Sequence, residues 1–221
     1  MKIKMLFGAA AIVAGSALAA EAATASFDLT QSRAGSVRGS VVSTSGSDSV
    51  DISPAHSRGS RVIEKRAGRV VARGNGIGVK SKRGRRDDKR IDGRGKDEMA
   101  VVDFGKSKTL KSITFSGVGH RKNAVFDLFV YDDASQKWTR VASGLNKGSK
   151  GAGTHTFTFT KAYTGSRFAI GARGTRTAFN IVNVDTDDGF QQVSAVPLPA
   201  GGLLLVTGLA GLGMARRKKR A

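Results

Sequence analysis

The stretch Thr154-His-Thr-Phe-Thr-Phe-Thr160 decides the fold class. Its residues alternate, so that Phe157 and Phe159 share one face of an extended chain while the Thr residues between them share the other. A period of two is typical of a half-buried β-strand and does not fit an amphipathic helix. The stretch therefore predicts a sheet that packs one face against a core.

The same alternation continues through most of the second half of the chain, where turn-type residues separate the runs. Such runs occupy residues 99–104, 109–115, 125–131, 137–142, 167–172 and 177–184. Gly105 to Lys108 and Asp132 to Ser135 are the clearest turns between them. Because no stretch of residues 26–195 shows a sustained 3.6-residue stripe, the pattern predicts an all-β fold, an antiparallel β-sandwich or jelly roll.

The apolar residues of these runs are the expected core. They are Phe104, Phe115, Phe126, Leu128, Trp138, Phe157, Phe159, Phe168, Ile170, Phe179 and Ile181. The first half is less clear: segments 26–30, 37–42, 50–52, 61–63 and 69–73 are short and rich in Ser, Gly and Arg, so they could be strands or partly disordered.

Composition sets limits on function. The 221 residues include no Cys, which excludes disulfides, thiolate catalysis and Cys metal sites. Residues 26–195 hold 30 Lys and Arg against 16 Asp and Glu, a net charge of +14. A basic excess of this size attracts anionic partners and makes their association sensitive to salt.

The positive charge is concentrated in a predicted loop at residues 80–96, which has hardly any apolar side chains. We expect it to be solvated and to bind polyanions through Lys80, Lys82, Arg83, Arg85, Arg86, Lys89 and Arg90. A solvated loop without a partner is the alternative.

Both ends of the chain predict export. Two Lys in Met1 to Lys4, an apolar run over Met5 to Leu18 and small residues up to Ala25 are typical of a secretory signal peptide, here residues 1–25. A first transmembrane helix is the alternative, but the run is short for one. The mature part would then lie outside the cytoplasm.

The last 26 residues predict a membrane segment. Val196 to Ala215 could just span a bilayer as a helix, although five Gly residues weaken that helix. The cations that follow would stay on the cytoplasmic side of the inner membrane. They are Arg216, Arg217, Lys218, Lys219 and Arg220.

The motif Val196, Pro197, Leu198, Pro199, Ala200, the Gly/Leu-rich segment and the basic end together resemble the VPLPA variant of the PEP-CTERM sorting signals. This resemblance implies recognition by an exosortase-type transpeptidase in the inner membrane, with release to the cell surface or an exopolysaccharide matrix. The Pro residues would keep the motif extended and accessible. A membrane anchor that is never cut remains the alternative.

A weaker resemblance covers most of the exported part. Gly74 to Val79, Val102-Asp-Phe-Gly105, Phe126-Asp-Leu-Phe129 and Phe168 to Ala172 are similar to the β-sandwich ectodomain of proteins with this tail. That family supplies no catalytic residues to carry over. Its usually acidic stretch before the Phe-Asp-Leu-Phe segment reads Gly119-His-Arg-Lys-Asn-Ala124 here, which argues against a cation site.

Other motifs favour structural readings. Gly105-Lys106-Ser107 lacks the first Gly of a phosphate-binding loop, so a β-turn fits better. Asp185 and Asp187 are weak candidates for a calcium loop, because Gly189 comes one place late and Ser194 stands where the bidentate Glu should be. The three His residues show no metal-type spacing, and we expect no metal or other cofactor.

The expected division of the chain follows from these segments. It is a signal peptide 1–25, an N-terminal half of the sandwich 26–98 with the basic loop 80–96, main strands 99–188, a stalk 189–195 and the sorting tail 196–221.

The expected function is that of an exported, non-enzymatic structural or adhesive protein that binds an acidic exopolysaccharide and has no small-molecule substrate. An extracellular nucleic-acid-binding protein is the first alternative, although residues 80–96 contain no aromatic residue for base stacking. A polysaccharide hydrolase is the second, if folding brings together carboxylates among Asp97, Glu98, Asp103 and Asp127.

Overall fold

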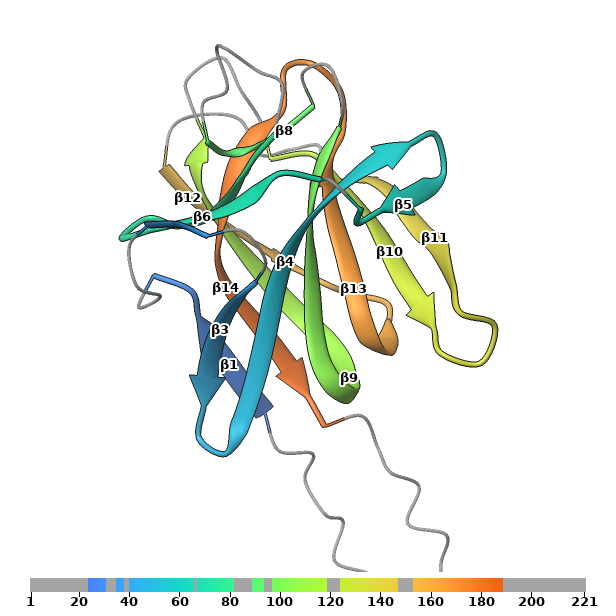
Figure 1. Ribbon diagram of the computed structural model, residues 1–221. Coiled ribbons are helices and arrows are strands. Elements are labelled where there is room, and N and C mark those ends of the chain that lie inside the picture. The colour runs from blue at the N-terminus through green and yellow to red at the C-terminus, as the bar shows by residue number, and fades with distance from the viewer. Residues whose placement is uncertain are drawn as a thin grey trace, which may run out of the picture.

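The computed structural model confirms the all-β class and is built from antiparallel strands (Figure 1). It describes residues 24–30, 35–37, 40–65, 67–81, 89–93, 97–118, 124–146 and 153–188. Of the predicted signal peptide 1–25, only Thr24 and Ala25 are described, as the start of a strand, and the whole of the predicted stalk and sorting tail lies outside the described residues. No helix within the described ranges is long and apolar enough to cross a membrane.

The described residues form fourteen strands. In the first half these are β1 Thr24–Asp28, β2 Gly35–Val37, β3 Val41–Ser45, β4 Asp48–Arg58, β5 Arg61–Ile63, β6 Arg69–Arg73, β7 Gly76–Lys80 and β8 Ile91–Asp92. In the second half they are β9 Glu98–Val118, β10 Phe126–Asp132, β11 Lys137–Leu145, β12 Gly153–Thr158, β13 Thr164–Ala172 and β14 Ala178–Asp187. The Ser- and Arg-rich first half is thus largely built into the sheet.

The strands form two layers that face each other across the core. In the first layer, β11, β10, β13, the first part of β9 and β4 follow one another, and β3 and β5 pair with β4. In the second layer, β12, the last part of β9 and β14 are neighbours, and β14 also pairs with β1, β7 and β8. β7, β6 and β2 complete this layer.

Strand β9 joins the two layers, so they are one continuous hydrogen-bonded sheet and not two separate ones. The sequence predicts a turn at Gly105 to Lys108, but the chain passes through this segment as a bulge. Gly105 has φ 65°, and its N–H donates to Asp103 Oδ1 at 2.8 Å. The pairing with β13 shifts register there, from Arg167 opposite Asp103 to Gly165 opposite Lys108. A bulge bends a strand, which lets β9 continue from one layer into the other.

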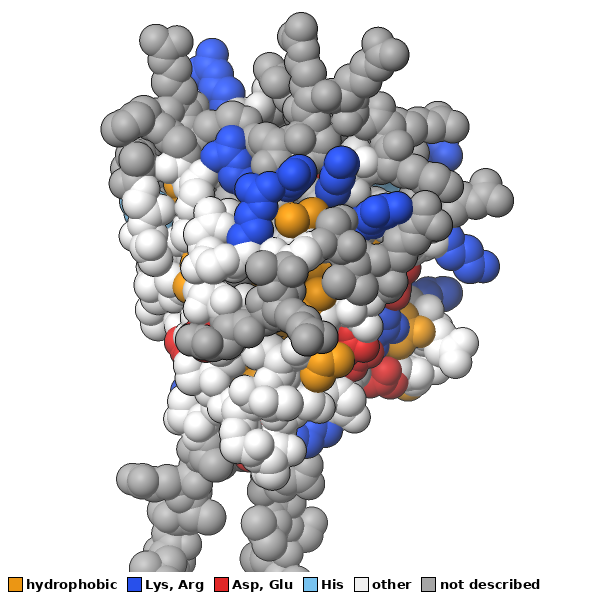
Figure 2. Space-filling model, turned by 60° about the vertical axis from the view of Figure 1, so that its left-hand side comes forward, with side chains coloured by type: hydrophobic (Ala, Val, Ile, Leu, Met, Phe, Trp, Pro, Cys, Tyr) orange, Lys and Arg blue, Asp and Glu red, His pale blue; other side chains and the backbone are white. Residues whose placement is uncertain are grey.

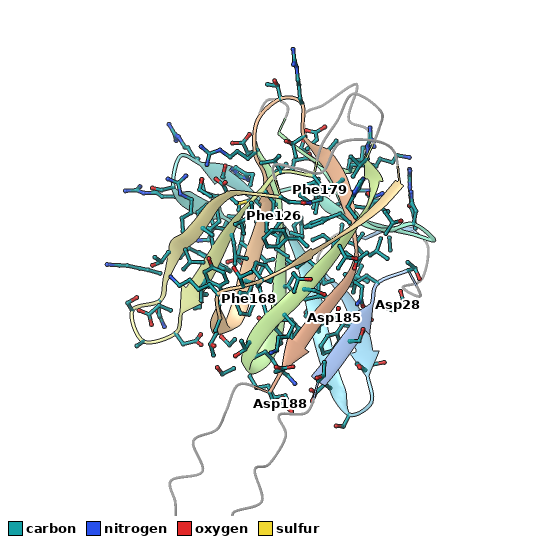
Figure 3. All side chains as sticks on the ribbon, turned by 180° about the vertical axis from the view of Figure 1, so that it is seen from behind. Asp28, Phe126, Phe168, Phe179, Asp185 and Asp188 are labelled. Atoms are coloured by element: carbon teal, nitrogen blue, oxygen red, sulfur yellow. The ribbon has the colours of Figure 1, made fainter. Side chains whose placement is uncertain are left out.

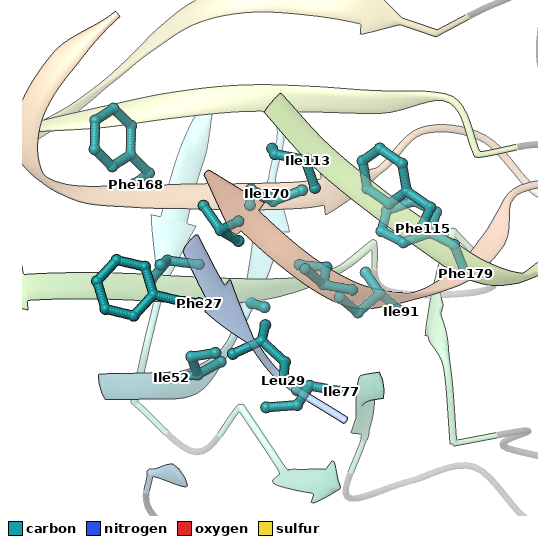
Figure 4. Packing of buried hydrophobic residues seen from close by; sticks show 14 of the residues in the cluster. Phe27, Leu29, Ile52, Ile77, Ile91, Ile113, Phe115, Phe168, Ile170 and Phe179 are labelled. Atoms are coloured by element: carbon teal, nitrogen blue, oxygen red, sulfur yellow. The ribbon is translucent and has the colours of Figure 1, made fainter. Parts of the chain in front are cut away.

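Aromatic side chains from both layers meet in the core (Figure 4). The ring centroids of Phe115 and Phe126 lie 5.0 Å apart, and those of Phe126 and Phe157 lie 5.4 Å apart. Eight predicted core residues are buried: Phe104, Phe115, Phe126, Leu128, Phe168, Ile170, Phe179 and Ile181. Phe157, in the edge strand β12, and Phe159, just after it, are half-buried and pack against this core.

Trp138 packs elsewhere than predicted. It lies on the outer face of the first layer, beside a smaller buried cluster that includes Met99, Val101 and Phe129. Its indole N–H donates to Glu64 Oε1 at 3.2 Å, and the Arg167 guanidinium lies 5.3 Å from its ring centroid. Its N–H needs a polar partner, which this half-buried face supplies.

The fold has two distinct ends, which we call proximal and distal. At the proximal end, β1 begins and β14 finishes side by side, with Thr24 opposite Asp187 (Figure 1). Figure 3 shows Asp188 at this end and Phe126 and Phe179 farther from it. The distal end contains β8, the β4–β5 turn and the β13–β14 turn, residues 173–177.

Candidate functional site

The described part of the predicted basic loop, residues 80–96, lies at the distal end, and it is not solvated throughout, because Ile91 and Asp92 form the buried strand β8. Lys80 closes β7, which runs antiparallel to β14 and therefore points away from the proximal end. The Arg90 guanidinium donates to the carbonyl oxygen of Gly117, near the distal end of β9. Lys89 is exposed. The predicted contacts Lys82, Arg83, Arg85 and Arg86 lie outside the described residues.

Folding brings to the distal end further cations that lie outside residues 80–96 in the sequence. Arg69 stands opposite Lys80 in the β6–β7 pair. The β4–β5 and β13–β14 turns contribute Arg58, Arg61, Arg173 and Arg176, all exposed. Figure 2 shows most of the blue Lys and Arg side chains of the visible face gathered in its upper half, whereas the red carboxylates lie lower.

Two carboxylates at this end point inward. Glu98 is 3% exposed and accepts hydrogen bonds from the backbone N–H groups of Ser81 at 2.9 Å and Asp92 at 3.3 Å. Asp92 is 7% exposed. These two carboxylates are therefore not available for direct contact with a partner in solution.

A pocket of about 210 Å³ opens on the outer face of the first layer, at its distal end. Gly171 of β13 is its centre: it stands opposite Met99 of β9 on one side and Asp127 of β10 on the other. Met99 and Phe129 also line the pocket but are almost fully buried. The other lining residues are Ser57, Gly59, Asp97, Arg140, Ala172 and Arg173.

Asp127 holds two guanidinium groups in this pocket. Its Oδ1 accepts hydrogen bonds from the backbone N–H of Gly144 at 2.8 Å, from Ser143 Oγ at 3.0 Å and from Arg173 at 3.2 Å. Its Oδ2 lies 3.6 Å from an Arg140 nitrogen. Such charge-assisted contacts fix the two Arg side chains at the rim of the pocket.

Asp97 provides the second carboxylate. Burial raises its pKa, a hydrogen bond from Ser57 at 3.3 Å works in the opposite direction, and the negative charge of Asp127 raises the pKa further. Arg173 partly offsets that charge. Asp97 therefore takes up a proton more readily than an ordinary aspartate.

The structure brings together only two of the four carboxylates that the sequence offers to a hydrolase. Asp97 and Asp127 line one pocket. Glu98 is turned into the protein, and Asp103 pairs with Arg167 Nε at 3.1 Å. Strands β9 and β10 are each antiparallel to β13, so they run in the same direction and begin at the same end of the sheet. This places Asp97 and Asp127 near each other, which cannot be seen without the order of the strands in the sheet.

The weak calcium candidates lie within β14. Asp185 Oδ1 accepts from Asn183 Nδ2 at 2.7 Å, and Asp187 Oδ2 forms an ion pair with Lys111 at 2.6 Å. No group of three or more His, Asp or Glu residues that could hold a metal occurs in the described ranges.

Comparison with known proteins identifies no family for this chain. No protein-family model matches it, and no curated protein matches it. The solved structures that match include several carbohydrate-binding modules, at low identity and with partial coverage.

Three of these structures illustrate the level of similarity. The family 32 module of Clostridium perfringens NanJ, in complex with galactose, is 14% identical with a TM-score of 0.32, covering 62% of this chain and 93% of the module. Chitosan-binding module 1 from the Paenibacillus sp. IK-5 chitosanase/glucanase is 18% identical with a TM-score of 0.31, covering 44% and 71%. The C. perfringens module CpGH89CBM32-6 is 16% identical with a TM-score of 0.29, covering 42% and 67%. Likeness at this level carries no statement about the ligand of this chain.

Proposed function

We propose that this protein is an exported, non-catalytic domain that holds an acidic polysaccharide at its distal end. The observation that carries the proposal is the gathering of Lys and Arg at that end, opposite the pairing of Thr24 with Asp187. A polymer with regularly spaced carboxylate or sulfate groups meets several of these cations at once. Each exposed ion pair contributes little, about 0–1 kcal/mol, but many together give avidity.

The proposal includes a route to the cell surface. The N-terminal segment 1–25 directs export, and the tail Val196 to Arg220 is the substrate of an exosortase-type transpeptidase at the inner membrane. The proximal location of Thr24 and Asp187 supports this arrangement, because attachment through either end directs the basic end away from the anchor.

Nucleic acid is a weaker partner for this surface. Binding of single strands combines cations with aromatic side chains on which bases stack. In the described ranges, the exposed large hydrophobic residues are limited to Val42, and no Phe, Tyr or Trp is exposed. A polysaccharide needs no stacking platform to bind through charge.

Charge reversal at the distal end tests the proposal. Lys89→Glu combined with Arg176→Glu should lower the salt concentration at which the protein elutes from immobilised polygalacturonate. The matched control is Lys137→Glu with Lys161→Glu, which reverses two exposed cations near the proximal end and should elute almost as the wild type does. The shift is expected because salt screens the attraction between exposed charges, so a surface with fewer cations releases the polyanion at a lower salt concentration.

Three results would contradict the proposal. They are no retention at low salt, retention that salt does not affect, and equal losses in the distal and proximal variants. Displacement by DNA at lower concentrations than by polygalacturonate would assign the surface to nucleic acid instead.

A further inference from the structure

The pocket around Gly171 differs in charge from the basic surface near it. It contains two carboxylates, Asp97 and Asp127, and two guanidinium groups, Arg140 and Arg173. With all four ionised, these charges cancel. Long-range attraction for polyanions therefore does not explain this site.

The contacts within the pocket exclude simple ions as its ligands. A metal cation would stand close to two guanidinium groups, and a small anion would stand close to two carboxylates. Like charges at such distances cost free energy in a partly desolvated site. The pocket instead offers acceptors and donors side by side.

A hydroxyl group fits this arrangement, because it can donate to a carboxylate and accept from a guanidinium at the same time. Asp127 is already engaged with Gly144, Ser143 and the two Arg residues, so its role is to position the donors. Asp97 accepts one side-chain hydrogen bond among the described residues, from Ser57, and is the acceptor best placed for a ligand.

The size and lining of the pocket restrict the ligand further. A volume of about 210 Å³ is below the roughly 300–1,000 Å³ of sites for drug-sized molecules. The Met99 side chain fills the space over Gly171, since a Cβ there would lie 2.6 Å from Met99 Cε. The walls that a ligand meets are therefore mainly the polar side chains of Asp97, Arg140 and Arg173.

We propose that the pocket formed by Asp97, Arg140, Arg173 and Gly171 binds one uncharged, hydroxyl-rich sugar ring. Asp97 accepts hydrogen bonds from ring hydroxyls, and Arg173 and Arg140 donate to them. The site adjoins the basic surface and shares Arg173 with it, but its ligand is uncharged, so its binding is independent of the proposed retention of polyanions.

Calorimetric titration of the mature protein with the methyl glycosides of glucose, galactose and mannose tests this inference. At least one glycoside should bind, and Asp97→Asn should weaken it about tenfold or more through loss of a charged acceptor. Arg173→Gln, at a half-exposed side chain, should weaken it similarly without affecting folding. The matched control Asp133→Asn changes a carboxylate in the β10–β11 turn and should leave affinity unchanged.

Opposite outcomes are equally specific. Failure of all three glycosides to bind, or equal affinity in wild type and Asp97→Asn, overturns the inference. Tighter binding of glucuronate or galacturonate than of the neutral glycosides assigns the pocket to anions. Release of nitrophenol from nitrophenyl glycosides, abolished by Asp97→Asn, makes the carboxylate pair catalytic and overturns a pure binding role. Retention on polygalacturonate should persist in Asp97→Asn, which separates this site from the basic surface.

Discussion

At the residue scale, Lys108 is the one Lys or Arg side chain among the described residues that is fully buried. Its Nζ contacts the carboxylates of Asp48 and Asp188, whose side chains are 16% and 43% exposed. Lys106 Nζ joins the same group, 2.6 Å from Asp48 Oδ1. A buried charge is tolerated only with such partners.

Replacing Lys108 with Met should therefore destabilise the protein strongly. Without the Lys108 ammonium, the negative charge of Asp48 is less well compensated. We expect the free energy of unfolding to fall by about 3 kcal/mol. Lys106→Met is the matched control, since it removes a half-exposed ion pair to the same Asp48 and should cost less than about 1 kcal/mol. Urea unfolding measures both, and equal losses would contradict the role assigned to Lys108.

The same group predicts how stability depends on pH. Hydrogen bonds from Lys106 and Lys108 hold the pKa of Asp48 below its ordinary 3.8. A carboxyl whose pKa is lower in the folded state stabilises above the unfolded pKa and loses that contribution as pH falls through the folded one. We expect the free energy of unfolding to decline below about pH 4, with a shallower decline in Asp48→Asn.

Lys108 gives the corresponding effect in alkali. Burial lowers its pKa, but hydrogen bonds to Asp188 and Asp48 outweigh burial, so the pKa lies above its ordinary 10.5. Its contribution is present below that pH and disappears as pH rises through the folded pKa. Urea unfolding at a series of pH values measures both the acid and the alkaline dependence of stability. Identical acid profiles for wild type and Asp48→Asn would disprove the assignment.

At the element scale, the packing of β7 against the segment around Lys89 depends on Gly78. A Cβ at this position would lie 2.2 Å from the carbonyl oxygen of Lys89 and 3.0 Å from Arg90 Cα. These are backbone atoms, which cannot move aside as a flexible side chain can. The sequence by itself does not distinguish Gly74, Gly76 and Gly78, whereas the structure does.

Gly78→Ala should therefore destabilise the fold and displace the described part of the basic loop. We expect a loss of at least about 2 kcal/mol, comparable to other backbone and overpacking changes. Gly74→Ala is the control, because a Cβ there meets nothing within 4 Å and the backbone needs no positive φ. Thermal unfolding compares the two, and an undisturbed Gly78→Ala protein would show that the close approach is absent.

At the scale of the whole molecule, the two ends of the described domain lie together because β1 pairs with β14. A tail attached after Asp188 and a leader attached at the start of β1 would therefore leave from the same end. Such an arrangement would present the basic end and the Gly171 pocket away from an anchor. Both proposed binding surfaces would then face the surroundings of the cell.

Processing at both termini is the prediction at this scale. Intact mass of the native protein, from membranes and from the extracellular matrix, should show loss of the N-terminal leader in both fractions. The matrix form should also lack the residues after the Val196 to Ala200 motif. Pro197→Ala with Pro199→Ala should keep the full tail and remain in the membrane fraction, because an extended motif is no longer enforced. An untrimmed native protein would refute the sorting signal.

Local patterning predicts much of the second half of the fold but not its connections. The alternation around Phe157 and Phe159 identifies β12, and the Asp132 turn forms as expected, with Asp132 Oδ1 accepting from the Ala134 N–H at 3.0 Å. The turn predicted at Gly105 is wrong, because a Gly with positive φ occurs in turns and in bulges alike. Only the partner strand β13 decides between them, since it pairs on both sides of the bulge.

The amino-acid sequence by itself determines the all-β class, most of the aromatic core, the excess of positive charge and the absence of cysteine chemistry. These properties depend on residue type and local period, which need no knowledge of distant neighbours. The tertiary structure alone decides that Asp97, Asp127 and Arg173 share a pocket and that Arg58, Arg69 and Arg176 reach the end of the fold where the basic loop lies. Strand order sets these relations, because residues far apart in sequence become neighbours only when β9, β10 and β13 pair.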